Sequence, residues 1–161
     1  MNFPKDFIWG TATSAYQIEG AYNRDGKGVS IWDTFCHTPG KINDNETGDI
    51  ACDHYDKYED DIKLLKSLHM DSFRTSMQWS RLLTKDGKLN QEGAQFYHKV
   101  CKCAKENQIE LCIILICRPI CLKEADGKAG MWWKLMQPMP EPLFVSLVQR
   151  SGTGLLSTNP S

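Results

Sequence analysis

Gln17 and Glu19 follow the first apolar segment of the chain, and both carry groups that can bind a polar ligand. The Gln17 amide offers two hydrogen-bond donors and one acceptor, so it can bind adjacent hydroxyl groups. Glu19 is the carboxylate nearest to it, but no sequence feature supplies the second carboxylate that a general acid and base pair needs. We therefore expect Glu19 to cap the loop or to pair with a lysine.

Arg74 is the second candidate binding residue. It lies within the segment Ser72–Met77, which we expect to be a buried strand, and an unpaired charge is costly to bury there. We therefore expect an anionic group beside it. Trp32 and Trp79 offer flat faces on which a ligand ring could stack. Buried tryptophans in a core are more common, so we interpret both as packing residues.

The sequence predicts neither a metal site nor a cofactor. Its seven cysteines are an odd number without the paired CxxC spacing of a zinc site. No GxGxxG or GxxxxGK pattern follows a predicted strand, which argues against nucleotide binding. We expect free thiols in a reducing compartment.

Strands and helices alternate along the first part of the chain. The unbroken apolar run at residues 111–117 is typical of a strand buried on both faces of a parallel sheet, and residues 7–12 and 72–77 predict two earlier strands. Helices are predicted after Asp53 and Asn90, which we expect to be N-caps. This order gives either an open α/β sheet or a (β/α) barrel. The apolar positions at helical spacing are Tyr55, Tyr58, Ile62, Leu65 and Leu68 in the first helix and Tyr97, Val100, Cys101 and Ala104 in the second.

The end of the chain has a different character. Residues 137–142 place prolines at alternate positions, which excludes a helix or a central strand there. We therefore divide the chain into a folded unit over residues 1–117 and a divergent, poorly structured tail over residues 118–161. A shifted reading frame or an alternative exon junction would explain this tail.

The composition places the chain among globular proteins, since 41% of its residues are hydrophobic and 24% are charged. A net charge of −1 gives no reason to expect nucleic acid or an anionic membrane as a partner. No apolar run reaches the ~18 residues of a membrane span, and the first residues lack the apolar stretch of a signal peptide. We expect a cytoplasmic protein with a small neutral ligand.

Five collinear segments stand out in the first half of the chain, namely Phe3–Gly20, Asp25–Gly28, Ser30–Phe35, Thr47–Tyr55 and Phe73–Arg81. Together they resemble glycoside hydrolase family 1, the β-glucosidases and their relatives. Such proteins are retaining β-glycosidases on a TIM (β/α)8 barrel, with the active site at the carboxyl ends of the strands. The resemblance therefore implies an α/β fold that forms part of a TIM barrel, namely its first three βα units.

The same resemblance assigns substrate-binding roles to two residues. Gln17 matches a glycone-binding residue of the family, and Arg74 matches an arginine beside the nucleophilic carboxylate. The ligand implied is a β-glucoside or a related small sugar, which a partial site binds weakly at best.

Both catalytic glutamates of the family are missing from these 161 residues. The family carries the acid/base in Thr-x-Asn-Glu-Pro and the nucleophile in Thr-Glu-Asn-Gly, and neither pattern occurs. Residues 139–142 imitate the first, but Pro140 replaces the asparagine and the prolines around it exclude a buried strand. Cys117-Arg118-Pro119 stands where the family has a sugar-binding His-x-Asp. We therefore predict no catalytic residue in this chain.

These observations leave two functions open. The first is an N-terminal fragment of a family 1 β-glycosidase that is inactive alone. In one variant of this interpretation, the fragment complements a C-terminal part that is encoded separately. The second is a non-catalytic sugar-binding or regulatory partner of an intact glycosidase. Because a partial barrel has exposed strand edges, we expect aggregation or association through those edges in either case.

Overall fold

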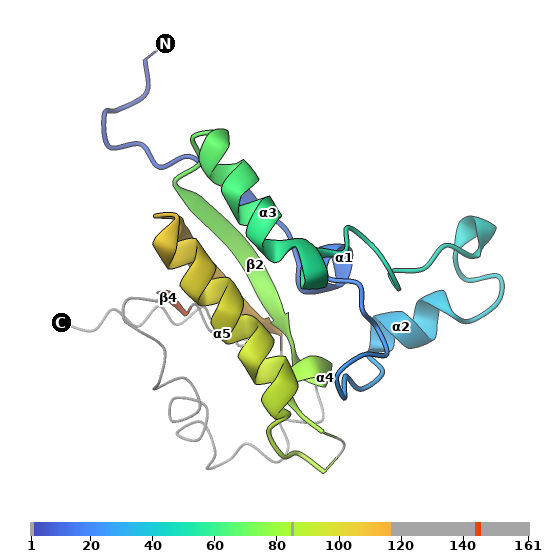
Figure 1. Cartoon of the computed structure of the whole chain (residues 1–161). Coiled ribbons are helices and arrows are strands. Elements are labelled where there is room, and N and C mark those ends of the chain that lie inside the picture. The colour runs from blue at the N-terminus through green and yellow to red at the C-terminus, as the bar shows by residue number, and fades with distance from the viewer. Residues whose placement is uncertain (1, 85, 117–143, 146–161) are drawn as a thin grey trace, which may run out of the picture.

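The computed structural model describes residues 2–84, 86–116 and 144–145, in which strands alternate with helices (Figure 1). The strands are β1 (Gly10–Ala12), β2 (Ser72–Gln78), β3 (Glu110–Ile116) and β4 (Phe144–Val145). The helices are α1 (Ala15–Ile18), α2 (Ile31–Cys36), α3 (His54–Ser67), α4 (Trp79–Leu82) and α5 (Gln91–Glu106), with the 3-10 helix η1 (Asn43–Asn45) between α2 and α3.

The four strands form one parallel sheet in the order β1-β2-β3-β4. β2 and β3 pair from Ser72 opposite Glu110 to Gln78 opposite Ile116. β1 pairs with β2 in a register that puts Ala12 opposite Arg74. The helices α3 and α5 lie side by side on one face of this sheet (Figure 1). The predicted βαβ order of the first 117 residues is therefore confirmed as far as residue 116.

The core lies between the sheet and these two helices. Successive residues of a strand point to opposite faces, and Phe73 and Met77 of β2 point toward the helices and are buried. Ile62 of α3 meets them and has no exposed surface. Burying each such side chain contributes about 1.5–3 kcal/mol. The other buried core residues are Phe96, Tyr97, Val100, Cys101, Cys103, Ala104, Ile109, Leu111 and Ile113.

The structure corrects several details of the predicted elements. β3 is buried on one face rather than on both, because Leu111 and Ile113 are buried while Cys112 and Ile114 keep some exposure. Leu68, predicted on the inner face of the first helix, is the C-cap residue and is 55% exposed. The stretch between β1 and α3, for which the sequence analysis predicts no helix or strand, contains two short α-helices and a 3-10 turn.

Both predicted N-cap residues stand at the N-cap position, but neither caps its helix with its side chain. Asp53 has a left-handed backbone (φ 58°) and forms an ion pair with Lys57 (3.1 Å). The Asn90 amide instead donates to the carbonyl oxygens of Asp25 (2.7 Å) and Arg81 (2.9 Å). The side chain that sequence reasoning assigns to the start of α5 therefore joins the loop at Asp25 to α4.

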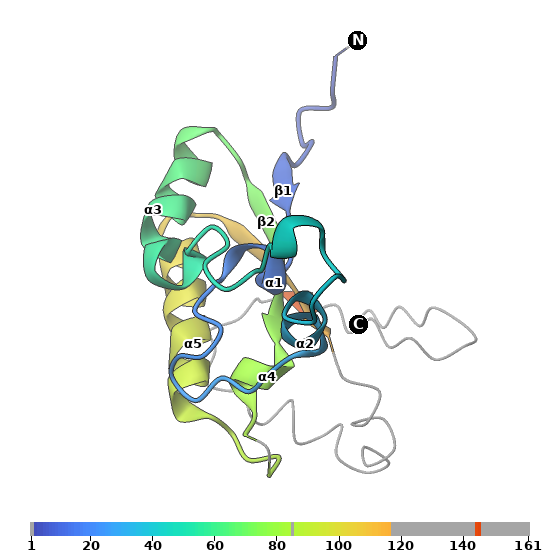
Figure 2. The ribbon, with the colours of Figure 1, turned by 90° about the vertical axis from the view of Figure 1, so that its right-hand side faces the viewer.

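The second face of the sheet carries no long helix among the described residues. Figure 2 shows α1 and α2 on the side of the molecule that faces the viewer there, with α3 and α5 at the left. The short strand β4 pairs with β3 at Cys112 and Ile113, although it belongs to the segment predicted to be poorly structured. The prediction for the other tail residues falls outside the described part of the chain.

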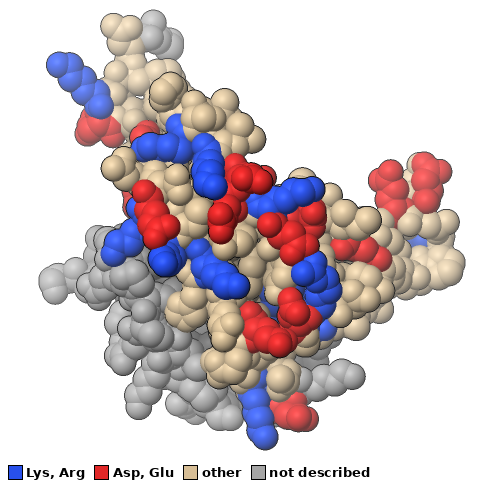
Figure 3. Space-filling model, viewed as in Figure 1, with Lys and Arg blue, Asp and Glu red and all other residues tan. Residues whose placement is uncertain are grey.

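Charged side chains of both signs are intermixed over α3 and α5 (Figure 3). Ion pairs at i,i+4 spacing contribute to this pattern, such as Glu59–Lys63 and Lys102–Glu106 (both 3.8 Å). This face therefore has no surface of a single charge sign. No helix within the described ranges has the length and apolar character needed to cross a membrane.

Candidate functional site

Gln17 lies in α1, which begins directly after the carboxyl end of β1. The Ser14 hydroxyl, at the N-cap position, donates to Gln17 Oε1 (2.8 Å). This contact orients the amide, whose NH2 group has no hydrogen-bond partner among the described residues and is exposed. The structure thus presents Gln17 as a ready donor to a polar ligand.

Arg74 lies in β2, and its carbonyl accepts a hydrogen bond from Thr13 N (2.9 Å). Its side chain is exposed and stands between the buried residues Phe73 and Thr75. It therefore points to the face opposite α3 and α5. Within the described part of the chain, no carboxylate lies within ion-pair distance of it. Exposure to water explains how this charge is tolerated without the expected anionic neighbour.

The structure brings both predicted site residues to one face of the sheet. Ser76, two positions beyond Arg74, accepts a hydrogen bond from Ala15 N through its Oγ (2.9 Å). Because strand residues two apart point to the same face, α1 and Gln17 stand on the face that Arg74 occupies. The result is a polar surface at the first two strands, able to bind hydroxyl groups and one anion.

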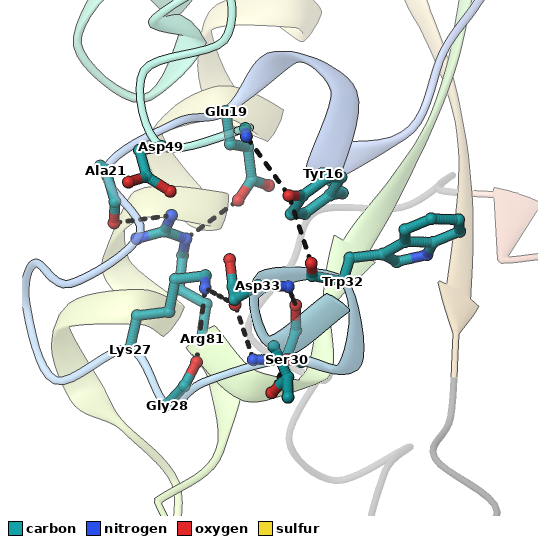
Figure 4. A network of polar contacts seen from close by, with 12 residues as sticks. Tyr16, Glu19, Ala21, Lys27, Gly28, Ser30, Trp32, Asp33, Asp49 and Arg81 are labelled. Carbon is teal, nitrogen blue, oxygen red and sulfur yellow. Dashed lines mark hydrogen bonds and ion pairs between the residues drawn. The ribbon is translucent and has the colours of Figure 1, made fainter. Parts of the chain in front are cut away.

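Glu19 belongs to a buried network behind this surface, shown in part in Figure 4. Its Oε2 accepts from Arg81 Nε (3.0 Å), and its Oε1 accepts from the Tyr97 hydroxyl (2.7 Å). Arg81 Nη2 also donates to the carbonyl oxygen of Gly20 (3.0 Å). The expectation that Glu19 caps a loop or pairs with a lysine is therefore wrong. The network joins the end of α1 to α4 and α5.

Burial and the bonds to Arg81 and Tyr97, which occupy both carboxylate oxygens, keep Glu19 from exchanging a proton with a ligand. Burial raises the pKa of Glu19, against the opposing effects of Arg81 and Tyr97. Burial also raises the pKa of Tyr97 well above its ordinary value, so its hydroxyl stays protonated and donates. The Arg81 guanidinium carbon lies 4.3 Å from the centre of the Tyr55 ring, a cation–π contact. Arg81 and Tyr97 thus hold the Glu19 carboxylate in place, and Tyr55 packs against Arg81.

A second buried ion pair holds the loop before α2 (Figure 4). Asp33 Oδ2 accepts from Lys27 Nζ (2.8 Å) and from Ser30 N (2.6 Å), and Asp33 N donates to Ser30 Oγ (3.1 Å). The last two bonds form a capping box. Although burial alone raises it, the hydrogen bonds from Lys27 and Ser30 hold the pKa of Asp33 below its usual range. Asp33 is therefore a structural carboxylate.

Tyr16 connects α1 to α2. Its hydroxyl donates to the Trp32 carbonyl (3.5 Å) and accepts from Gly48 N (3.3 Å). The Tyr16 and Trp32 rings are stacked with centres 5.9 Å apart. Trp32 is 53% exposed, so its interpretation as a core residue is wrong, whereas Trp79 is partly buried. One face of Trp32 is thus available for a contact outside the described residues.

Sequence reasoning missed most members of these networks. Ser30 and Asp33 have the spacing of a capping box, which is a signal that the sequence does contain. Arg81 and Glu19 are 62 positions apart, and no local pattern indicates that they pair. The same holds for the contact between Tyr97 and Glu19.

The described residues contain no group of three or more His, Cys, Asp or Glu side chains that could hold a metal ion. A hollow of about 270 Å³ lies beside α3, and neither Gln17 nor Arg74 lines it. It is lined by Ala21, Tyr22, Asn23, Arg24, Asp49, Ile50 and Asp53. The candidate site is thus an open surface, suited to binding and orienting a ligand rather than enclosing it.

The family model, the curated relatives and the solved structures that match this chain agree with one another. A family model described as "Glycosyl hydrolase family 1" matches residues 1–128. Beta-glucosidase A of Acetivibrio thermocellus is 57% identical over 116 residues, which cover 71% of this chain and 26% of that protein. The chain spans about a quarter of the length of curated relatives that it matches.

Solved structures show the same relationship at the level of fold. The GH1 beta-glucosidase from Exiguobacterium antarcticum B7 superimposes with a TM-score of 0.77 at 35% identity, covering 93% of this chain and 36% of that one. A beta-glucosidase from Thermotoga maritima, solved in complex with a methoxycarbonyl-substituted glucoimidazole, gives a TM-score of 0.70 at 38% identity, covering 81% and 32%. The described sheet is therefore part of a TIM barrel.

Proposed function

Because the chain belongs to glycosyl hydrolase family 1, we propose that it supplies the glycone-binding wall of a β-glucosidase and takes no part in breaking the glycosidic bond. The observation that supports this most directly is the placement of Gln17 and Arg74 on one face of the sheet, the face away from α3 and α5. In a TIM barrel that face lines the interior, and the site lies at the carboxyl ends of the strands.

Gln17 binds the sugar in this proposal. Its NH2 group donates to one hydroxyl of a glucose unit, while the Ser14 contact fixes the orientation of the amide. Adjacent hydroxyls of a sugar need donors and acceptors in a defined order. Hydrogen bonds to such hydroxyls that strengthen in the transition state contribute several kcal/mol to glycoside hydrolysis.

Arg74 prepares the site for the nucleophile. A guanidinium group beside a carboxylate favours the ionised form of that carboxylate, which is the form that attacks the anomeric carbon. The cation is already exposed on the inner face of the sheet. The carboxylate must come from chain outside these 161 residues, since the family's nucleophile motif does not occur in them.

Retaining hydrolysis needs two carboxyl groups ~5 Å apart, one to protonate the leaving oxygen and one to attack. Glu19 and Asp33 are buried and bound to Arg81 and Lys27, so neither serves in these roles. We therefore propose that this chain binds and orients the sugar only, and that the chemistry belongs to the remaining part of the barrel.

A chimera tests this function. Residues 2–116 of this chain replace the matching segment of the Acetivibrio beta-glucosidase A, which supplies both glutamates. We expect the chimera to hydrolyse an aryl β-glucoside. Gln17→Ala should then lower kcat/KM by about 100-fold and Arg74→Met by about 1000-fold, in line with the loss of hydrogen bonds and of a charge partner.

Two variants on the outer helix α5 serve as matched controls. Gln95 and Lys99 are exposed there, and Gln95→Ala and Lys99→Met should leave kcat/KM unchanged. A chimera that folds but shows no turnover would contradict the proposed function. So would a chimera whose kcat/KM is insensitive to both Gln17→Ala and Arg74→Met.

A further inference from the structure

Tyr97 is a buried residue of α5 whose hydroxyl bonds to two elements of the candidate site. The hydroxyl donates to Glu19 Oε1 (2.7 Å) and accepts from Gln78 N (2.8 Å). The residue is 4% exposed. A neutral phenol has one proton to donate and lone pairs with which to accept, so it can make both bonds at once. Because burial raises the pKa of Tyr97 well above its ordinary value, the hydroxyl keeps this proton at neutral pH.

The two bonds end on the elements that carry Gln17 and Arg74. Glu19 is the C-cap residue of α1 and follows Gln17 by two positions. Gln78 is the last residue of β2 and follows Arg74 by four positions, so it lies at the carboxyl end of the strand. One hydroxyl from the outer helix α5 thus connects both elements.

The helix α1 depends on such contacts for its place. It has four residues, and a helix of that length is not stable in water by itself. The bond from Ala15 N to Ser76 Oγ (2.9 Å) fixes its first residue, and the bonds to the Glu19 carboxylate fix its C-cap residue. Gln17 lies between these two attachments. β2, by contrast, pairs with β3 from end to end and with β1 at Arg74, so Arg74 keeps its position without the hydroxyl.

The ring and the hydroxyl of Tyr97 have separable roles. The ring packs against Phe96 with centres 5.0 Å apart and belongs to the core, and a phenylalanine ring would fill the same space. The ion pair between Glu19 and Arg81 (3.0 Å; Figure 4) does not involve the hydroxyl. Loss of the hydroxyl therefore leaves the core filled and the carboxylate paired, and it removes one of the connections between α1 and β2.

We propose that Tyr97 is a positioning residue for sugar binding, because its hydroxyl holds α1 against the end of β2 and so sets where the Gln17 amide stands relative to Arg74. This inference rests on the proposed function and deepens it. Tyr97 does not touch the sugar and acts through Gln17. A displacement of about 1 Å at a reacting site can cost on the order of 100-fold in rate, so a residue behind the site can control turnover.

A double-mutant cycle in the covalent chimera tests the inference. We expect Tyr97→Phe to lower kcat/KM for an aryl β-glucoside by about tenfold. In the Gln17→Ala background, the same substitution should change kcat/KM by less than about twofold, because an amide that is absent cannot be displaced. A loss of stability alone would lower the activity by the same factor in both backgrounds.

Tyr58→Phe is the matched control. The Tyr58 ring packs against the same Phe96 ring, with centres 6.0 Å apart. Its hydroxyl, however, donates to Glu59 (3.2 Å) within α3 and contacts neither α1 nor β2. Tyr58→Phe should therefore leave kcat/KM unchanged in both backgrounds.

Amide exchange in the full 161-residue chain tests the positioning directly, without any turnover. In Tyr97→Phe, the Gln78 amide loses its acceptor and the Glu19 amide belongs to the loosened end of α1. Both should exchange at least about tenfold faster than in the original chain. The amides of residues 73–75 in β2 should keep their rates, and Tyr58→Phe should change none of these amides.

Unchanged exchange at Glu19 in Tyr97→Phe would overturn the inference, and so would an equal loss of kcat/KM in both backgrounds of the cycle. A chimera that is sensitive to Gln17→Ala but not to Tyr97→Phe rejects this inference and leaves the proposed function standing. An inactive chimera rejects the proposed function, and the exchange measurement then decides whether Tyr97 positions α1. Should Tyr97→Phe unfold, the Glu19 and Gln78 amides of the original chain decide, since exchange as fast as in an unfolded peptide would contradict both bonds.

Discussion

Glu19 shows how strongly one buried carboxylate can couple stability to pH. Its side chain is 3% exposed and bound to Arg81 and Tyr97, and burial raises its pKa above the ordinary value of 4.5. The folded chain therefore holds this proton more tightly than the unfolded chain does. By linkage, the free energy of unfolding must fall as the pH rises through the interval above 4.5.

We predict that Glu19→Gln removes this pH dependence. Urea unfolding of both chains is measured over a pH series. The quantity compared is the unfolding free energy of the original chain minus that of the variant. This difference should become smaller with rising pH. The exposed Glu92→Gln is the control and should give a small constant difference. If the difference between the original chain and Glu19→Gln grows with pH, then Arg81 lowers the pKa of Glu19 by more than burial raises it.

The cysteines should differ widely in reactivity. Burial raises the pKa of Cys101 to about 11, whereas Cys52 is exposed. Because the thiolate is the reactive form, we predict that iodoacetamide at pH 8 modifies Cys52 first and Cys101 only after unfolding. A mass-spectrometric time course checks this. In the control, a urea-unfolded sample, the two cysteines should react at the same rate. Equal rates in the folded chain would contradict the burial of α5.

For single residues, the sequence predicts where a side chain lies along the fold better than it predicts which residue that side chain contacts. The places of Gln17 and Arg74 at the first two strands follow from local patterns. The partner of Glu19 does not, because hydrogen bonds between residues far apart in sequence depend on how the loops fold. The sequence does not predict the exposure of Trp32 for a similar reason. Tryptophan is usually buried, and only the packing of neighbouring segments determines whether this one is.

Gly93 determines how closely α5 approaches α4. A Cβ atom at this position would lie 2.1 Å from the Arg81 carbonyl oxygen, a backbone atom that cannot move aside cheaply. Glycine to alanine within a helix ordinarily stabilises by up to about 1 kcal/mol. Here we predict the opposite, a loss of about 2 kcal/mol, because the added methyl group overpacks the junction.

Chemical denaturation of Gly93→Ala measures this effect. Glu92→Ala at the exposed neighbouring position provides the control and should be neutral or slightly stabilising, as helix propensity predicts. An increase in stability for Gly93→Ala would show that α5 packs less closely against α4 than the structure indicates.

The main elements were predictable because their periodicity extends over many residues. The apolar spacing in α5 and the apolar run of β3 each identify an element and its buried side. Helices α1 and α2 were not predicted, since segments of four and six residues are too short to show a helical period. α2 depends instead on its capping box and on the buried Lys27–Asp33 pair.

For the molecule as a whole, we predict that the purified 161-residue chain has no glucosidase activity of its own. Neither catalytic glutamate motif is present, and loss of both carboxylates costs many orders of magnitude in rate. An assay with an aryl β-glucoside checks this. Turnover that is abolished by Glu19→Gln or Glu141→Gln would contradict it, because one of these carboxylates would then be catalytic.

The tail after β3 leads to a prediction about the gene. Family 1 proteins carry Leu-x-Glu-x-x-Gly-Gly-Trp after the third strand, and residues 122–127 follow this pattern up to its first glycine. The family match likewise extends to residue 128. If residues 128–130 are encoded AAG-GCT-GGN, the frame two nucleotides on reads GGC-TGG, which restores Gly-Trp. Residues 153–154, read as ACT-GGN, contain TGG in that same frame.

We therefore predict that the transcript, read in this second frame after codon 127, continues into a strand ending in Asn-Glu-Pro. Sequencing the transcript and its locus measures this directly. A frame that stops or encodes no such strand would refute the frameshift and favour an unrelated exon. If the strand is present, the shifted frame encodes the acid/base glutamate that this chain lacks. Residues 128–161 then take no part in sugar binding, which is why the chimera leaves them out.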